Sequence, residues 1–525
     1  MGIQPRRTLL LVLLAACVGA LFPAALPAAA QSSTSTGSVG GGPADLVVLH
    51  TNDVHGQVLA RPATWLRDVD PLPDSGGLPR LAARLVGLVR EIEESGAAVV
   101  LCDGGDWFQG TPEGQVDDGR AFLEAFAAVG HDAVVPGNHE FDHGVDVFLE
   151  HLRAIEMPAV LANVRMPDGS PLPGTVEHVV VERAGLRIAL VGLLTTGTPA
   201  ITHASTKALV WEDPAEALAR VRRDLGDDVD LVLPVTHMGV EDERALARAH
   251  PDLPLVGGGH SHTFLRKGVR EGRTLVVQAG AKASVIGRVD VWLDEDGGVE
   301  GLRASHVELY REPGPASRNE RVDSLCRALV ERAAGRMDEV VGVLGGPLDV
   351  TRRELVNSSA GNLITDAMRE RTGADVAIHN RGGIRTSLPA GPVTRRDLFM
   401  VLPFSNHVET VTLEGSAVIE LFRRSVESDR RSGLEFSGVT LEVDASGPQP
   451  RLLRVLRPDG QAIGADDAIR LTTNSYLAAG GDGWDVLAAA QAREIDSVLL
   501  RDLLEDAMAG GALTPATDTR YEVFR

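Results

Sequence analysis

Apolar and polar positions alternate regularly along residues 45–310, and this pattern predicts an α/β domain. Short apolar runs typical of buried strands are expected at 45–51, 97–102, 133–135, 159–162, 188–192, 230–235, 255–258, 276–280 and 287–293. Between them, apolar residues that recur at helical spacing predict helices at 78–95, 122–129, 148–155 and 214–225. A second α/β pattern follows, with a helix at 361–371 and strands at 376–379, 399–402 and 471–474.

Polar side chains directly follow five of the predicted strands in the first pattern. In chain order these are Asp53 and His55, Asp106, Asn138 and His139, His237, and His260 and His262. Open α/β sheets place their binding sites at the carboxyl ends of strands. Each turn taken singly also fits an ordinary polar loop, and Asp103 could simply cap its turn. Five strand ends with matching residue types indicate one shared site.

The stretch AVVPGNHEFDHG at 133–144 carries a possible proton-handling pair. His139 and Asp142 stand three positions apart, so on one helical turn they would share a face. Asp142 could then hold the imidazole of His139 in one tautomer and favour its charged form.

The remaining polar residues have the chemistry of metal ligands. Asp53 and His55 are two positions apart, as are His260 and His262, and in an extended segment such pairs point to one side. Seven ligand-type side chains are too many for one tetrahedral zinc ion. They fit two ions that share a carboxylate, about 3.5–4 Å apart. Asp106, which follows two glycines, is the candidate bridge.

Composition sets limits on partners. The chain has 525 residues, which is too many for one core and predicts two domains. Its net charge is −22, which argues against non-specific binding to a nucleic acid polymer or an anionic membrane. Metals and a few arginines could still create a local site for phosphate.

The N-terminus predicts export. Residues 1–30 combine a charged start, an apolar run and an alanine-rich cleavage site, as in a signal peptide. We expect cleavage after Ala30 and a periplasmic or secreted protein. The sequence LAAC ending at Cys17 also fits a lipoprotein motif, so a lipid anchor there is the alternative. Residues 31–44 are predicted to form a flexible tether, and no later apolar run is long enough to form a transmembrane segment.

Several other residues are interpreted as structural. A disulfide between Cys102 and Cys326 is possible, but we expect two inert thiols. Histidines outside the strand ends are interpreted as structural or surface residues, namely His50, His131, His143 and His151.

The second half adds candidate substrate contacts. Residues 313–339 are predicted as an interdomain linker with an arginine-rich helix, and 340–525 as the second domain. Arg385, beside glycines, could bind a phosphate or carboxylate through its planar fork. Phe404 and Tyr476 each follow a predicted strand end. A lone aromatic there is usually packing, but in a chain with only 4% aromatics the two together suggest a clamp for a nucleobase.

These motifs resemble those of a known enzyme family. Asp53-x-His55, Gly105-Asp106, GNHE at 137–140, His237 and GHSH at 259–262 look like the calcineurin-like metallophosphoesterase signature. The longer forms LHTNDVHG, GNHEFD and THMG resemble the bacterial 5′-nucleotidase branch, and the second half resembles its C-terminal substrate-binding domain. The resemblance implies a four-layer α/β/β/α metallophosphoesterase sandwich at 45–312 with a second α/β substrate-binding domain.

The resemblance also implies roles for individual residues. One divalent ion (Zn²⁺, Mn²⁺, Co²⁺ or Mg²⁺) would be held by Asp53, His55, Asp106 and His262. The other would be held by Asp106, Asn138, His237 and His260. His139 and Asp142 match the catalytic dyad. The nucleotide-binding positions correspond to Asn380, Arg385, Phe404, Asn406, Gly433, Tyr476 and Asp482, with the base between Phe404 and Tyr476 and the ribose hydroxyls on Asp482. Tyr476 replaces the usual Phe, and Arg352 and Arg353 do not align with the family's phosphate-binding arginines.

The expected function is hydrolysis of nucleoside 5′-monophosphates to nucleoside and phosphate. The same residues would also suit a nucleotide-sugar or nucleoside di- or triphosphate hydrolase. A 2′,3′-cyclic phosphodiesterase with 3′-nucleotidase activity fits the opening motif TNDVHG less well. A surface protein that only binds nucleotides is a further alternative, against which the complete set of metal ligands argues.

Overall fold

The computed structural model describes residues 42–63, 73–310, 317–335, 337–351, 354–427, 433–490 and 492–525. The predicted signal peptide with Cys17, most of the predicted tether, and Arg352 and Arg353 lie outside them. Within these ranges, no helix is both long enough and apolar enough to cross a bilayer.

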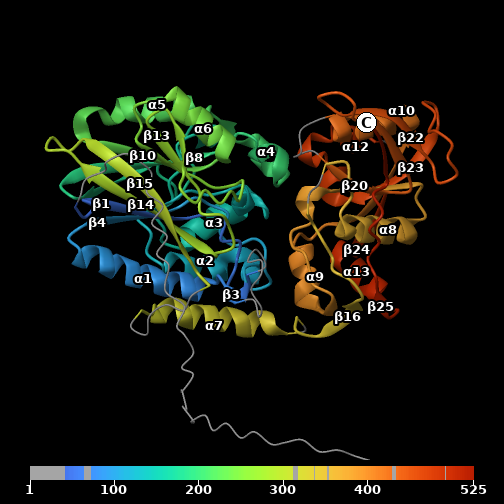
Figure 1. Cartoon of the computed structure of the whole chain (residues 1–525), viewed down its shortest axis with the longest axis horizontal. Helices are drawn as coiled ribbons and strands as arrows, with labels where there is room; N and C mark the ends of the chain where they lie inside the picture. The colour runs from blue at the N-terminus through green and yellow to red at the C-terminus, as the bar shows by residue number, and fades with distance from the viewer. Residues whose placement is uncertain are drawn as a thin grey trace, which may run out of the picture. The chain divides into compact units, whose positions relative to one another are not determined.

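Two mixed sheets form the first half of the chain (Figure 1). One has the order β15 (Val299–Glu308), β14 (Val285–Leu293), β1 (Leu46–Thr51), β4 (Ala98–Asp103) and β5 (Ala133–Val134). The other has the order β12 (Val269–Glu271), β13 (Thr274–Val277), β11 (Leu255–Gly257), β10 (Leu231–His237), β8 (Leu186–Leu194) and β7 (His178–Arg183). Apolar side chains of both sheets, among them Val48, Val100, Leu190 and Leu233, form one core cluster between them.

Helices cover the outer face of each sheet. On the first sheet these are α1 (Leu78–Glu94), α2 (Arg120–Ala127), α3 (Val145–Ala154) and α7 (Glu320–Ala334), and on the second α5 (Pro214–Leu225) and α6 (Val240–Ala249). Figure 1 shows α1 and α7 side by side along the first sheet, and they are in contact. The predicted α/β/β/α layering is therefore confirmed.

Strand direction brings the functional turns together. β1, β4 and β5 run parallel in the first sheet, with Thr51 opposite Asp103. β8, β10, β11 and β13 run parallel in the second sheet. The residues predicted to form the site lie at or just after the ends of β1, β4, β5, β10 and β11. The carboxyl ends of parallel strands lie at one edge of a sheet, and this brings the predicted residues together.

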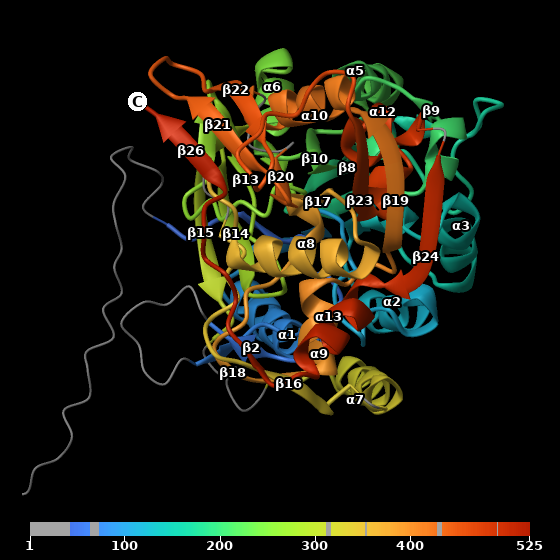
Figure 2. The same ribbon diagram turned by 90° about the vertical axis from the view of Figure 1, so that its right-hand side faces the viewer.

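The described residues of the second half form three sheets. The central one has the order β20 (Leu434–Ser437), β17 (Val376–Asn380), β23 (Ala468–Asn474), β19 (His407–Glu414) and β24 (Arg493–Leu499). The others are β18 (Gly391–Thr394), β16 (Val340–Leu344) and β25 (Ala512–Leu513), and β22 (Arg451–Leu456), β21 (Thr440–Asp444) and β26 (Tyr521–Phe524). The helices are α8 (Ser359–Thr372), α9 (Arg395–Val401), α10 (Gly415–Glu427), α11 (Ser475–Ala478), α12 (Asp485–Ala488) and α13 (Leu500–Met508). Figure 2 shows α8 lying across β17, which it contacts.

Two predicted strands are wrong. Residues 159–162 form only isolated bridges, because their N–H groups bond in turn to Val134, Val176 and Gly192 rather than along one partner strand. Residues 399–402 belong to the end of α9 and its C-cap. A capping box between Thr394 and Asp397 starts this helix and overrides the apolar run that suggested a strand.

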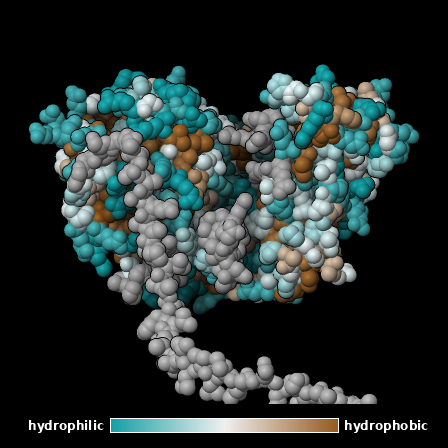
Figure 3. All heavy atoms as spheres, in the orientation of Figure 1, coloured by the Kyte–Doolittle hydropathy of each residue, from teal (hydrophilic) through white to brown (hydrophobic). Residues whose placement is uncertain are grey.

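Helix α7, predicted as part of the linker, packs through Val322, Cys326 and Leu329 into the core between the first sheet and its outer helices. Cys102 in β4 and Cys326 in α7 are buried free thiols, as expected. Burial raises the pKa of Cys326 to about 12 and that of Cys102 further still. On the face shown in Figure 3, hydrophilic residues predominate and hydrophobic ones form small separate patches.

Candidate functional site

Seven side chains at the ends of five strands converge into one group, which we call the ligand cluster. Its members are Asp53, His55, Asp106, Asn138, His237, His260 and His262. Ligand atoms of Asp53, His55, Asp106 and His262 all lie within 4.8 Å of one another. Those of Asp106, His237 and His260 form a second such group. Asp106 belongs to both groups, as expected of a bridging carboxylate.

Within the cluster, imidazole nitrogens lie close both to other imidazole nitrogens and to carboxylate oxygens. His55 Nε2 lies 2.9 Å from His262 Nε2, and His262 Nε2 lies 3.1 Å from Asp53 Oδ1. His237 Nε2 lies 3.3 Å from Asp106 Oδ2. The opposite nitrogens are fixed by the backbone, since His55 Nδ1 contacts the carbonyl of Gln109 and His237 Nδ1 that of Gly104. These bonds leave the Nε2 atoms directed at the centre of the cluster.

The cluster fits two divalent cations. Asp53 Oδ1, Asn138 Oδ1 and His237 Nε2 are buried and make no hydrogen bond of good geometry within the described chain, although Asp53 Oδ1 and His237 Nε2 lie close to the charged or imidazole groups named above. Burial of such atoms is costly unless something pairs with them. Burial lowers the pKa of His260 to about 3, which keeps its imidazole neutral and able to ligate. Mixed carboxylate, amide and imidazole donors suit divalent first-row metals, and Asn138 supplies a hard oxygen.

The backbone of the cluster is unusual. Asp53, His55, Asp106, His260 and His262 all have positive φ angles, between 52° and 75°. The expectation that an extended segment places Asp53 and His55, or His260 and His262, on one side is therefore wrong. Asp53 and His55 converge through left-handed turns, held where Asp53 N donates to Gly105 O at 2.8 Å and His55 N donates to Asp106 O at 3.0 Å.

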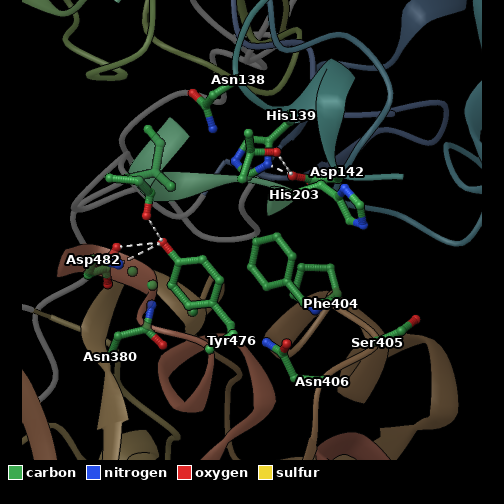
Figure 4. A pocket seen from close by; sticks show the side chains of 18 of the residues that line it. Asn138, His139, Asp142, His203, Asn380, Phe404, Ser405, Asn406, Tyr476 and Asp482 are labelled. Atoms are coloured by element: carbon green, nitrogen blue, oxygen red, sulfur yellow. Dashed lines mark hydrogen bonds and ion pairs between the residues drawn. The ribbon is translucent and has the colours of Figure 1, made fainter. Parts of the chain in front are cut away.

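His139 and Asp142 form a pair beside the cluster (Figure 4). They lie at either end of one 3₁₀ turn, His139–Phe141, and His139 Nδ1 is 2.8 Å from Asp142 Oδ2. Thr202 donates to the other carboxylate oxygen at 3.0 Å. Burial lowers the pKa of His139, but the charges of Asp142 and Asp106 outweigh it and the pKa is raised overall. His139 Nε2 faces the cluster, 4.0 Å from Asp106 Oδ2.

Two buried glutamates were given no role by the sequence. Glu140 accepts hydrogen bonds from the N–H groups of Asp106, Trp107 and Gly137. It occupies the fourth position of GNHE, and that position was the available signal. Glu243 in α6 accepts from Gly259 N at 3.1 Å and Gln278 Nε2 at 2.7 Å. No local pattern marks Glu243, because its partners are distant in sequence.

A cavity of about 580 Å³ opens beside the cluster. Its lining includes Asp106, Asn138, His139, Asp142, His260, His262, Asn380, Arg385, Phe404, Asn406, Tyr476 and Asp482. Figure 4 shows the Phe404 ring next to His139, with centroids 5.7 Å apart, and Tyr476 beyond it. Both rings are half-buried, although Tyr476 also packs against the core of the second half.

Polar groups of the second half face the same cavity. Arg385 Nη2 is 3.3 Å from His55 Nε2, so its guanidinium reaches the ligand cluster. Asn380 Oδ1 accepts from Asn474 Nδ2 at 3.0 Å, and Asn406 Oδ1 accepts from Ser475 Oγ at 3.2 Å. These bonds fix both amides in the wall.

The structure places several other residues of the sequence analysis differently from expectation or outside the cavity. Phe404 follows helix α9 rather than a strand. His143, interpreted as structural or surface, lines the cavity, whereas His50, His131 and His151 are buried away from it. Gly433 is not among the described residues of the lining and lies against the Arg381 side chain. Arg352 and Arg353 fall outside the ranges that the structure covers.

Comparison with known proteins agrees with this architecture. Residues 46–264 match the family model for calcineurin-like phosphoesterase, and residues 336–489 that for the 5′-nucleotidase C-terminal domain. A 5′-nucleotidase of Vibrio cholerae is 28% identical over 88% of this chain and 90% of its own length. The trifunctional nucleotide phosphoesterase YfkN of Bacillus subtilis is 28% identical over 91% of this chain, which spans 35% of that protein. The crystal structure of a 5′-nucleotidase precursor from Thermus thermophilus is similar, with a TM-score of 0.80, 26% identity, and coverage of 91% of this chain and 99% of that one.

Proposed function

The chain joins a calcineurin-like phosphoesterase domain to a 5′-nucleotidase C-terminal domain and belongs to the 5′-nucleotidase family, and from this we propose that it hydrolyses nucleoside 5′-monophosphates to nucleoside and phosphate. One observation carries the proposal. A single cavity is lined by the ligand cluster, by Arg385 and by the rings of Phe404 and Tyr476. A site with phosphate chemistry at one end and two aromatic rings at the other suits a nucleotide.

The metal assignment follows the two groups of ligand atoms. Asp53, His55, Asp106 and His262 would hold one divalent ion, and Asp106, His237 and His260 the other. Asn138, whose buried Oδ1 has no hydrogen-bond partner among the described residues, would complete the second set. When bound, a pair of such ions supplies charge neutralisation of the phosphoryl oxygens and a lowered pKa for water. The proposal also includes a metallophosphoesterase domain at 45–312, an interdomain linker at 313–339 and a substrate-binding domain at 340–525.

The chain's own groups would orient and protonate the substrate. Arg385 binds the phosphate next to the cluster, and its planar fork suits two oxygens at once. His139 stabilises the charge that develops on the phosphate or on the leaving 5′ oxygen. Asp142 Oδ2 accepts a hydrogen bond from the Nδ1–H of His139, which directs Nε2 toward that charge. Phe404 and Tyr476 stack on the base, while Asn380, Asn406 and Asp482 contact the nucleoside.

Truncation of the aromatic rings tests the proposal. Stacking on an aromatic ring contributes about 1–3 kcal/mol per base, or roughly 5- to 150-fold in affinity. Phe404→Ala or Tyr476→Ala should raise KM for AMP by that order and change hydrolysis of a small aryl phosphate much less. Phe524→Ala, at an exposed aromatic in β26, is the control and should alter neither. Equal losses on both substrates together with a lowered melting temperature would instead place the rings in the core.

A substrate panel separates the related activities. Phosphate release should be greatest from nucleoside 5′-monophosphates and should stop with a chelator. Faster turnover of nucleotide sugars, di- or triphosphates or 2′,3′-cyclic nucleotides would select the corresponding alternative. Nucleotide binding without phosphate release from any of them would indicate a binding protein.

We also propose that the protein is exported, with cleavage after Ala30. N-terminal sequencing of the protein isolated from its native host should then begin at Gln31. A lipid-modified N-terminus at Cys17 would overturn this processing and establish a membrane anchor.

A further inference from the structure

Tyr476 and Asp482 form a closed hydrogen-bonded ring in the cavity wall. The Tyr476 hydroxyl donates to Asp482 Oδ1 at 2.8 Å and accepts from the backbone N–H of Asp482 at 3.1 Å. Figure 4 shows the hydroxyl directed at Asp482, with both bonds drawn. A phenylalanine ring could stack on a base equally well, but it could make neither bond.

These two hydrogen bonds hold Asp482 in an uncommon backbone conformation. Asp482 has a φ of 55°, and its neighbours Gly480 and Gly483 also have positive φ. A non-glycine residue in this region is strained unless its surroundings fix it. The bond from Asp482 N to the hydroxyl fixes the backbone, and the bond to Oδ1 fixes the carboxylate.

The hydroxyl has a second acceptor in the first half of the chain. The carbonyl of Ala200, in the short helix α4 (Thr198–Ile201), lies 3.1 Å from it. One proton serves one acceptor at a time, so donation to Ala200 and to Asp482 alternate. Burial and the charge of Asp482 raise the pKa of Tyr476 well above its ordinary value, which keeps the hydroxyl protonated as a donor.

We propose that the Tyr476 hydroxyl is a specificity-determining group that positions Asp482 to bind the ribose hydroxyls, and so favours ribonucleotides over dideoxynucleotides. The inference rests on the proposed nucleotidase function. A carboxylate has about four lone-pair sites, so accepting the tyrosine proton leaves capacity for a ribose hydroxyl. Tyr476 thus combines a stacking surface with a positioning role.

Tyr476→Phe isolates the hydroxyl, because the ring is retained. KM for AMP should rise about 3- to 10-fold, the usual effect of losing one hydrogen bond, with kcat little changed. KM for 2′,3′-dideoxyadenosine 5′-monophosphate, which has no ribose hydroxyls, should stay the same. In an Asp482→Ala background, Tyr476→Phe should have no further effect on AMP, because the hydroxyl acts through Asp482.

Tyr521→Phe is the matched control. Tyr521 is also a tyrosine of the second half, but it packs on Phe436 and is not among the described residues that line the cavity. It should leave both KM values unchanged. Equal effects of Tyr476→Phe on the two nucleotides, no effect on AMP, or additive effects with Asp482→Ala would each overturn the inference while the nucleotidase function stands. A wild-type enzyme that hydrolyses AMP no better than an aryl phosphate would overturn the function and the inference with it.

Discussion

Residue type and backbone conformation are linked in the ligand cluster. Aspartate, asparagine and histidine are the non-glycine residues most often found at positive φ, and they are also common metal ligands. Asp53, His55, Asp106, His260 and His262 use both properties. Gly137 meets the opposite demand, because a Cβ there would lie 2.2 Å from Asp106 Oδ1. The turns are shaped so that small and polar residues approach one another closely.

Asp106→Ala tests the shared carboxylate. Because Asp106 belongs to both groups of ligand atoms, its loss should lower the content of both metals and abolish turnover. Metal analysis of the purified variant measures this directly. Asp290→Ala, which removes a buried carboxylate paired with Arg288 and Arg303, should lower stability but keep two ions per chain. Full metal occupancy with normal turnover in Asp106→Ala would contradict the assignment.

His139→Ala tests the neighbouring dyad. A positioned proton donor contributes roughly 10²- to 10⁴-fold to rate, so kcat should fall by that order while the metals remain bound. Asp142→Asn should cost less, because the imidazole stays in place but loses its charged partner. Steady-state kinetics combined with metal analysis distinguishes the roles. A metal-depleted His139→Ala protein would mean that His139 is itself a ligand.

At the scale of elements, buried carboxylates support the loops that carry the ligands. Glu140 joins the turn after β4 to the turn after β5 through three backbone N–H groups. Glu243 reaches from α6 beneath the loop that carries His260 and His262, and Gln278 extends this network to Ser261. Neither glutamate is among the described residues that line the cavity. Each therefore acts by fixing the loops that carry the ligands.

Glu243→Ala should destabilise this loop. Its removal leaves the Gly259 N–H and one N–H of the Gln278 amide without an acceptor, at about 1–3 kcal/mol per group, while the other N–H of Gln278 still donates to Gly259 O. Thermal unfolding should shift downward, and calorimetric titration should show weaker binding of Mn²⁺. Glu243→Gln keeps one acceptor oxygen, so its melting temperature and Mn²⁺ affinity should fall between those of the wild type and of Glu243→Ala. Glu241→Ala removes an exposed glutamate of the same helix, whose pair with Arg244 is screened by solvent and contributes little to stability. Similar shifts in Glu241→Ala and Glu243→Ala would rule out the supporting role.

Local signals determine how far the sequence predicts these elements. Helix α5 is predicted at its observed bounds because Asp213 caps it, Pro214 begins it and Gly226 follows it. The predicted strand at 399–402 is wrong because the apolar run alone does not account for the Thr394–Asp397 capping box. The strand ends predict the ligand cluster, since parallel strands bring their ends together. Glu243 and the Tyr476–Ala200 contact could not be predicted, because tertiary packing alone brings those groups together.

At the scale of the whole molecule, one buried ion pair joins the two halves of the described chain. Arg396 in α9 pairs with Glu113 from the loop after β4, and their side chains are only 6% and 1% exposed. Arg396 Nε also donates to Asp338 at 3.0 Å. Nearby, Lys282 Nζ donates to Thr386 Oγ1 at 3.1 Å. Charged groups thus link the halves close to the cavity that both of them line.

Glu113→Ala should be strongly destabilising. Removing one partner leaves Arg396 buried without its main countercharge, which costs about 3–5 kcal/mol. A double-mutant cycle with Arg396→Met, followed by thermal unfolding, measures the coupling. Glu124→Ala breaks an exposed pair with Arg120 on helix α2 and should cost about 1 kcal/mol or less. A loss in Glu113→Ala no larger than in Glu124→Ala would show that the buried pair does not contribute.

The two thiols of the folded chain bear on how the protein can be produced. Cys102 and Cys326 sit in separate core clusters, and neither is paired. Stability at these two positions therefore comes from packing rather than from a covalent cross-link. A version without residues 1–30, expressed in a reducing cytosol, should reach the same fold, and dithiothreitol should leave its melting temperature unchanged.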